Sequence, residues 1–222
     1  KIKPHQRWEI IVGLEHWAQW AGTSPDRGKQ PSSFKDYIRI ICAKEGGTGA
    51  SVSDSINALG NHLGREHLAI NYLADNYILS FYHDIPFEDG SGTDFRSFPD
   101  GTYCFYYGSK KKDQWITDVM YEFYYTKYQS GSQHDRPATP EEMEKQDPNS
   151  HFYGRKVLGG CDNYFNNGEY RSGWTLYERV IGSPFMTPGL SGNITRIINN
   201  RVIAHHIGMK GMAWQTTPYK LM

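Results

Sequence analysis

The sequence lacks several features that would place it in a membrane, export or nucleic-acid class. No run of about 18 apolar residues occurs, so a membrane-spanning helix is not expected. The N-terminus has no short apolar core of the kind found in secretory signals. Lysine and arginine total 24, as do aspartate and glutamate, so no global field attracts nucleic acid or an anionic membrane. These absences predict a soluble chain, made in the cytoplasm, with neither a membrane span nor a nucleic-acid partner.

Cysteine is also scarce. Cys42, Cys104 and Cys161 are odd in number and widely spaced, which fits neither a disulfide framework nor a CxxC zinc ribbon. At least one thiol is therefore expected to be free. His62 and His67 lie five positions apart, but neither an HExxH motif nor a nearby third ligand accompanies them. We expect no metal and no cofactor.

Glycine and aromatic residues are plentiful, which favours a loop-rich protein with aromatic grooves suited to a polymer or a peptide. The 222 residues suffice for one well-filled domain, and we find neither repeats nor a domain boundary. The polar residues 129–150, with Pro137, Pro140 and Pro148, predict a long surface excursion. It is either a lid over a cleft or an insertion with no role in turnover.

Local patterns predict helices alongside strands. Apolar spacing and capping residues indicate helices over 8–20, 33–46, 53–63, 114–128 and 174–181. A strand is predicted over 101–107 and a loop over 184–192. Residues 194–207 are predicted to form either a pair of strands or a strand and a turn around Asn199 and Asn200. Cys42, late in the second helix, and Cys104, in a strand, are expected in the core. The expected fold is α+β, with a central antiparallel sheet and packed helices, in one domain over residues 1–222.

Residues 67–81 form the most informative stretch. Their β-branched and aromatic residues flank Ala74, Asp75 and Asn76, which favour a turn, so the two arms are predicted to pair as a hairpin. Such a hairpin would bring its two ends, His67 and Ser80, to the same place. A histidine at the start of a buried strand is a candidate general base.

Cys161 is the candidate nucleophile. It follows Gly159 and Gly160 and precedes a segment that we expect to be helical, with Asp162 in its first turn. Backbone N–H groups at a helix start stabilise a thiolate and can later hold an oxyanion. A thiolate also needs a base, for which His67 fits, and a group that orients the base, for which Ser80 fits. His83 or Asp84 could orient the ring if the register shifts.

These pieces resemble the circularly permuted NlpC-type papain-like hydrolases, including the lecithin:retinol acyltransferase-like and PPPDE-type families. The matching segments are His67-Leu-Ala-Ile and Gly160-Cys161-Asp162-Asn163-Tyr164-Phe165, about a fifth of the chain. Gly160 stands where these families usually have asparagine, Asn71 interrupts the apolar strand, and Ser80 replaces the commoner orienting residue. The resemblance implies a papain-like fold and a cysteine amidase or endopeptidase, with Cys161, His67 and Ser80 as catalytic residues.

The chain also resembles bacterial type VI secretion effectors that cut peptidoglycan. This likeness implies peptidoglycan stem peptides as the substrate and activity as an antibacterial toxin in the periplasm of a target bacterium. It further implies an immunity protein and a secretion-apparatus carrier as partners.

Four alternatives stay open. His205 or His206 could replace His67 as the base. The same Cys and His site could serve a lipid acyl hydrolase or acyltransferase, which needs an apolar groove or membrane contact. Glu45, next to Gly46 and Gly47, could act as the acid of a lysozyme-like muramidase. The chain could also be a non-enzymatic module whose aromatic residues bind a glycan or a secretion partner.

Overall fold

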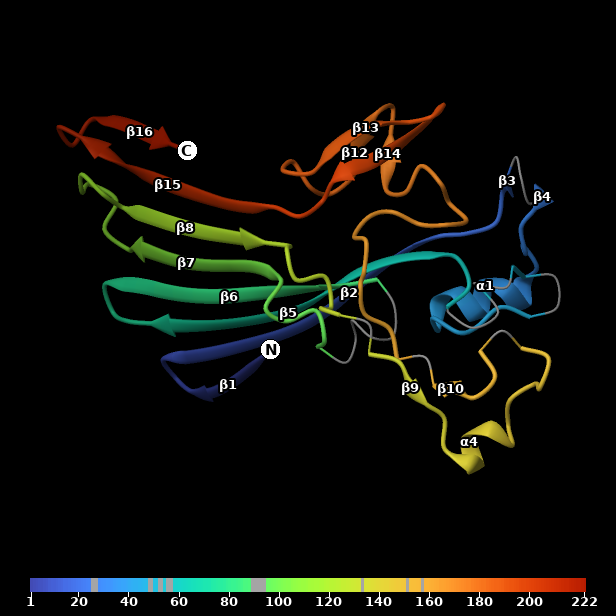
Figure 1. The fold of residues 1–222 in the computed structure, drawn as a ribbon. Helices are drawn as coiled ribbons and strands as arrows, with labels where there is room; N and C mark the ends of the chain where they lie inside the picture. Colours follow the sequence, from blue (N-terminus) through green and yellow to red (C-terminus); the bar gives the residue numbers. More distant parts are fainter. Residues whose placement is uncertain are drawn as a thin grey trace.

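A large antiparallel sheet dominates the computed structural model, which describes residues 1–222 except 25–27, 48–49, 52–53, 55–57, 89–94, 133, 151 and 157. Its strands run in the order β1-β2-β5-β6-β7-β8-β15-β16, and neighbours in this order are hydrogen-bonded (Figure 1). The bounds are β1 Ile2–His5, β2 Trp8–Gln19, β5 Asn61–Leu73, β6 Tyr77–Phe87, β7 Gly101–Ser109, β8 Asp118–Tyr125, β15 Ile203–Ala213 and β16 Thr217–Leu221. Most neighbours are also successive along the chain, so much of the sheet is a meander.

The remaining elements are short. The strands are β3 Thr23–Ser24, β4 Gly28–Lys29, β9 Arg136–Pro137, β10 Arg155–Lys156, β11 Thr175–Leu176, β12 Arg179–Val180, β13 Thr187–Ser191 and β14 Ile194–Asn199. Two helices are described, α1 Phe34–Ile41 and α4 Pro140–Met143. Figure 1 shows both helices beyond one end of the large sheet rather than over its strands.

The predicted α+β, papain-like fold with packed helices is wrong. The chain is mostly β, with 48% strand and 6% helix. Residues 8–20 and 114–128 were expected to be helical, but they contain β2 and β8. Both strands carry apolar residues on each of their two faces. When the two sets are read together along the sequence, their spacing resembles that of an amphipathic helix. Residues 174–181 form the β11-β12 hairpin, whose turn is set by Tyr177 and Glu178 at positive φ.

Other local predictions are confirmed. Strands β5 and β6 form the expected hairpin, and β7 covers the strand predicted at 101–107. Helix α1 begins at the expected cap, where the Ser33 side chain accepts a hydrogen bond from the Asp36 N–H. Cys104 is 1% exposed, as predicted, whereas Cys42 is exposed because it caps α1 on the solvent side.

The C-terminal predictions are only partly right. The strands expected within 194–207 exist, but β14 pairs with β13 and β15 pairs with β8, so they do not pair with each other. The loop expected over 184–192 contains β13. The helix expected over 53–63 falls partly outside the described residues, and its last residues begin β5. Residues 129–150 carry β9 and α4 outside the large sheet, although Gln129 and Ser130 are buried.

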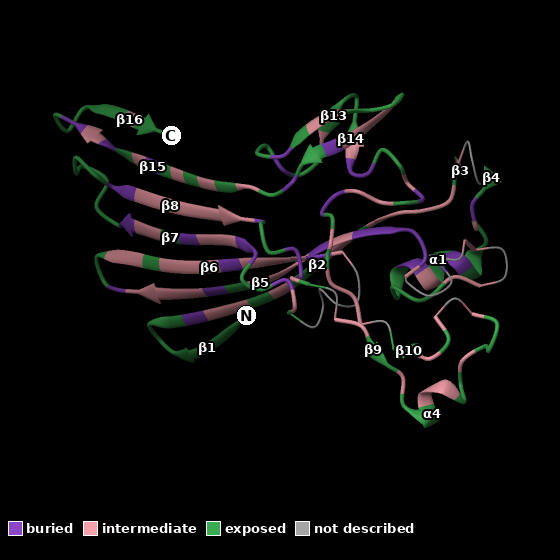
Figure 2. Cartoon of the chain, viewed as in Figure 1, coloured by how far each residue is buried: buried purple, intermediate pink, exposed green. Residues whose placement is uncertain are grey.

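The two faces of the large sheet differ in chemistry, because successive side chains of a strand point to opposite faces. One face, the polar face, carries charged and hydroxyl side chains, among them Glu15, Arg65, His67, Asp84 and Glu122. The other, the apolar face, is defined by Trp8, Ile10, Val12, Leu14, Leu68, Ile70, Tyr72, Tyr77, Leu79, Phe81, His83, Tyr103, Phe105, Tyr107, Val119, Tyr121, Phe123, Tyr125, Ile203, His205, Ile207 and Met209. Figure 2 shows that much of the sheet is only intermediate in burial or exposed.

The main core lies against one end of the polar face. The connection between β8 and β15 folds back there and buries Tyr164, Phe165, Trp174, Met186 and Ile197, and sheet residues such as Leu63 pack against this cluster. The sheet and this single connection therefore enclose the interior between them. None of the described helices has the length and apolar character needed to cross a membrane.

Candidate functional site

His67 contacts Asp84 rather than Ser80. The register places His67 opposite Asp84, and His67 Nδ1 hydrogen-bonds to Asp84 Oδ1. Ser80 lies opposite Asn71, four positions farther along β6, which is about 13 Å at the usual rise of a strand. Asp84, one of the two alternatives considered for a shifted register, thus holds the imidazole.

Cys161 lies in a turn of the β8-β15 connection. Its thiol is free and exposed, its φ is +57°, and its backbone N–H donates to the Gly131 carbonyl at 3.0 Å. The described residues that follow it form turns, so the helix start expected to stabilise a thiolate is not seen there. Among the described residues, no hydrogen bond joins the Cys161 thiol to His67.

The other candidate residues lie apart from one another. His205 is on the apolar face and hydrogen-bonds to the Tyr121 hydroxyl at 2.9 Å, whereas His206 is on the polar face, 2.8 Å from Glu122 Oε2. These neighbouring histidines therefore cannot serve the same site. Glu45 is exposed, in an isolated β-bridge with Ala58, rather than in the apolar pocket that a muramidase acid requires.

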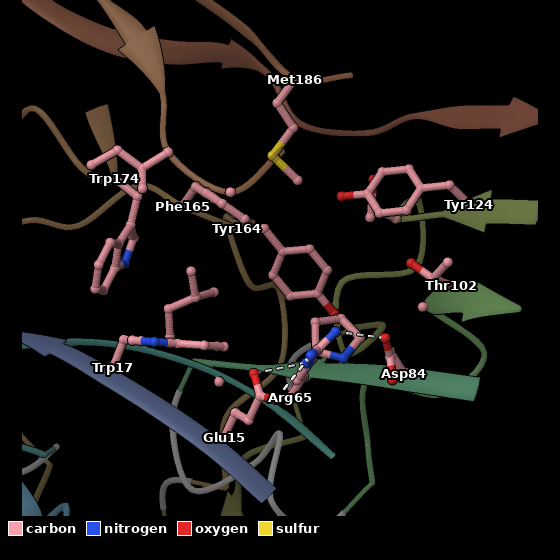
Figure 3. A pocket seen from close by; sticks show the side chains of 17 residues that line it. Glu15, Trp17, Arg65, Asp84, Thr102, Tyr124, Tyr164, Phe165, Trp174 and Met186 are labelled. Atoms are coloured by element: carbon pink, nitrogen blue, oxygen red, sulfur yellow. Dashed lines mark hydrogen bonds and ion pairs between the residues drawn. The ribbon is translucent and has the colours of Figure 1, made fainter. Parts of the chain in front are cut away.

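A cavity of about 400 Å³ lies between the polar face and the β8-β15 connection (Figure 3). This volume is within the range of roughly 300–1,000 Å³ typical of small-molecule sites. Its floor comes from the sheet and its roof from residues 164–186. The lining residues are Glu15, Trp17, Leu63, Gly64, Arg65, Asp84, Pro86, Gly101, Thr102, Tyr124, Thr126, Tyr164, Phe165, Trp174, Ile181, Gly182 and Met186.

Charged side chains on the cavity floor form one continuous chain. Arg65 donates two hydrogen bonds to Glu15, at 2.9 and 3.0 Å, and a third to Asp84 at 2.9 Å (Figure 3). Asp84 in turn holds His67. The bonds with Glu15 raise the pKa of the Arg65 guanidinium and lower that of the Glu15 carboxyl. Both groups are therefore fixed in place in their charged forms.

Aromatic rings form the rest of the cavity. Trp17 reaches it from β2, and Tyr124 from β8, while Phe165 and Trp174 reach it from the opposite side. The Trp174 side chain is buried, and its indole Nε1–H has no hydrogen-bond partner among the described residues. An unpaired buried donor is costly, and this N–H is enclosed by protein atoms rather than exposed to the cavity.

The cavity continues along the polar face into a second lobe of about 260 Å³. The two lobes share Arg65, Asp84, Thr102, Tyr124 and Gly182, and the second adds Tyr82, Glu122, Ser183 and His206. Burial alone would raise the pKa of Glu122, but hydrogen bonds with Tyr82 and His206 lower it. We call the two lobes together the polar-face site.

Sequence reasoning missed most of this site. Glu15 and Trp17 lie in a segment that the sequence analysis predicts to be helical, and Arg65 is not among its candidate residues. A recoverable signal existed, since charged residues at alternate positions within strand-like segments, such as Arg65 and His67, mark a polar sheet face. The contribution of Trp174 depends on a chain reversal that no local pattern reveals.

Two further observations bear on the chemistry of the site. Among the described residues, no group of three or more His, Cys, Asp or Glu side chains is placed to hold a metal ion. Comparison with known proteins finds no significant similarity, whether to family models, curated proteins or solved structures.

Proposed function

We propose that this protein is a carbohydrate-binding module whose ligand occupies the polar-face site. The observation that carries the proposal is the placement of Trp17 and Trp174 in the same cavity as the fixed chain of Glu15, Arg65 and Asp84. A binding role of this kind needs no nucleophile.

The chemistry of a sugar ring matches both parts of the cavity. A pyranose presents C–H groups on its faces, which pack on aromatic rings, and hydroxyl groups around its edge, which donate and accept hydrogen bonds. Carboxylates such as Glu15 and Asp84 accept hydrogen bonds from hydroxyls, and the rings of Trp17 and Trp174 offer apolar surface to the ring faces. Because these side chains hold one another in place before binding, they lose little conformational entropy when a ligand binds.

The shape and charge of the site narrow the class of sugar. Two adjoining lobes that share five lining residues favour an oligosaccharide over a single ring. Glu15, Asp84 and Glu122 outnumber the one guanidinium, Arg65, so an anionic sugar would meet excess negative charge. We therefore expect neutral or amino sugars to bind better than uronic acids.

The test is calorimetric titration of the full chain with three probes: chitohexaose, laminarihexaose and an alginate oligosaccharide. We expect at least one neutral probe to bind, with about tenfold weaker binding for Trp17→Ala. Trp214→Ala is the matched control, since Trp214 is exposed in the β15-β16 turn away from the site. If no neutral probe binds, or if both variants weaken binding equally, the proposal fails.

A cysteine hydrolase is the second candidate, favoured by the hydrogen bond between His67 and Asp84. An imidazole oriented by a carboxylate is what a general base requires. In this proposal Cys161 attacks an amide carbonyl in peptidoglycan stem peptides. Digestion of purified peptidoglycan, with release of new amino groups that Cys161→Ala abolishes, would support it, and full activity of that variant would eliminate it.

A further inference from the structure

Most of the apolar face of the large sheet is uncovered, although at one end Phe98 packs edge-on against His83, which is buried. No described helix lies over the face (Figure 1). Exposed side chains on it include Val12, Leu14 and Ile207. A groove of about 650 Å³ runs across its middle. Contiguous exposed apolar surfaces beyond a few hundred Å² are rare on monomers and mark sites of interaction.

In strands β2, β5, β6, β7, β8 and β15, Glu66 is the one Asp, Glu, Lys or Arg that the pairing register places on the apolar face. It lies opposite Leu14 and Ile85, and burial raises the pKa of this carboxyl, which favours its neutral form. The partner of such a surface must be apolar and offer few hydrogen-bonding groups, because burying unpaired polar groups is costly.

One border of the face has a different chemistry. The turn between β7 and β8 carries Lys110, Lys111 and Lys112, all exposed. The same turn presents Trp115, whose ring lies 5.4 Å from that of Trp214 in the neighbouring β15-β16 turn, and both rings are exposed. Tryptophan and lysine together are typical of positions where an apolar phase meets an anionic, hydrated layer.

Aromatic rings continue this border onto the sheet itself. Trp8 and Tyr72 are in contact, with centroids 4.9 Å apart, and Tyr72, Tyr77 and Tyr107 follow at spacings of about 6 Å. Each of these residues has an apolar body and a polar tip, which suits the boundary between hydrocarbon and water. Beyond this row the face is dominated by aliphatic and phenyl groups such as Ile70, Phe81 and Phe105.

We propose that the apolar face docks on a lipid bilayer with anionic headgroups. The acyl chains contact the aliphatic centre of the face, and the lysine turn lies at the level of the phosphates. The net charge of zero does not oppose this arrangement, because the attraction depends on charges within about one Debye length of the membrane surface. The polar-face site points away from the bilayer, since it lies on the opposite face of the same sheet.

The experiment is flotation of the purified full chain with phosphatidylcholine vesicles, with and without phosphatidylglycerol. Leu14→Gln/Ile207→Gln removes two side chains of the apolar face that are 67% and 65% exposed. Leu190→Gln/Ile198→Gln is the matched control, because these residues are 73% and 63% exposed on the β13-β14 hairpin instead. All four substituted residues lie on the surface, so the circular dichroism spectra of both variants should match that of the wild type.

We expect the wild type and the control to float and the apolar-face variant to partition at least about tenfold less. Lys110→Gln/Lys111→Gln/Lys112→Gln should weaken capture by anionic vesicles at low salt by at least about tenfold and leave capture by neutral vesicles unchanged.

Three results would overturn the proposal. The first is a wild type that does not float with either kind of vesicle. The second is an equal loss of binding in the apolar-face variant and its matched control. The third is a wild type that is dimeric, does not float, and becomes monomeric in Leu14→Gln/Ile207→Gln, because the face would then be covered by a second copy of the chain.

Discussion

Replacing Asp100 by alanine should destabilise the folded chain, because two buried backbone donors would lose their acceptor. Asp100 is fully buried, and its two carboxylate oxygens accept hydrogen bonds from the Tyr128 N–H at 2.8 Å and the Gln129 N–H at 2.6 Å. Gln129 and the next residue, Ser130, are themselves buried. Asp100 therefore fixes the point where the chain leaves β8 and starts to form the roof of the cavity.

The expected loss of stability follows from the two backbone N–H groups, of Tyr128 and Gln129, that would lose their acceptor. Each buried N–H left without a partner costs about 1–3 kcal/mol. Part of this cost is offset, because burial raises the pKa of Asp100 and so disfavours its carboxylate form in the folded state. A net loss of about 2–3 kcal/mol remains, and for a chain of this length that corresponds to a fall in Tm of roughly 5–10 °C.

Thermal unfolding followed by circular dichroism measures this loss. Asp113→Ala is the control, since Asp113 is exposed in the β7-β8 turn and its removal should change Tm by no more than about 2 °C. Asp100→Asn should fall between wild type and Asp100→Ala, because the amide keeps one acceptor oxygen. An Asp100→Ala protein as stable as Asp113→Ala would refute the assigned hydrogen bonds.

The structure supports three further predictions. Burial lowers the pKa values of His16 and His62, so these side chains bind protons more tightly in the unfolded chain. The free energy of unfolding should therefore fall as the pH drops below about 6.5. Urea titrations at several pH values should show that this free energy depends less steeply on pH in His62→Gln than in the wild type. A Cβ at Gly211 would overlap a backbone carbonyl of a neighbouring turn, so Gly211→Ala should lower Tm by several degrees, whereas Gly168→Ala, with open space around it, should not. If the hydrolase proposal holds, iodoacetamide should abolish turnover through Cys161, and protection of that thiol by substrate would be seen by mass spectrometry.

The sequence predicted the parts of the fold that depend on local chemistry. The hairpin at residues 67–81 follows from β-branched residues on either side of a turn, and helix α1 follows from the cap at Ser33. The prediction failed for β2 and β8, where apolar residues occupy both faces of one strand. Such a strand buries one face in the core and exposes the other, and a rule that assigns apolar residues to the interior cannot recognise it.

Less of the candidate site could be predicted from the sequence. The sequence pointed to His67 as a candidate general base, but the hydrogen-bond partner of its ring depends on register, and a difference of four positions separates Ser80 from Asp84. The pairing of Arg65 with Glu15 joins strands 50 positions apart in the chain. Contacts of this kind are set by the global strand order, which local propensity does not contain.

The polar-face site is built from two separate parts of the chain, the sheet and the connection between β8 and β15. Every roof residue lies between Tyr125 and Ile203, whereas nearly all of the floor belongs to the sheet strands. Strands β8 and β15 pair directly, so this long connection leaves and returns to adjacent positions. Loop-closure costs grow slowly with length, so the surface turns of this connection can be lengthened at little thermodynamic cost, whereas its buried cluster around Tyr164 and Trp174 has to be kept. If the polar-face site binds a ligand as proposed, insertions confined to this one connection would reshape the roof of the site and leave its floor unchanged.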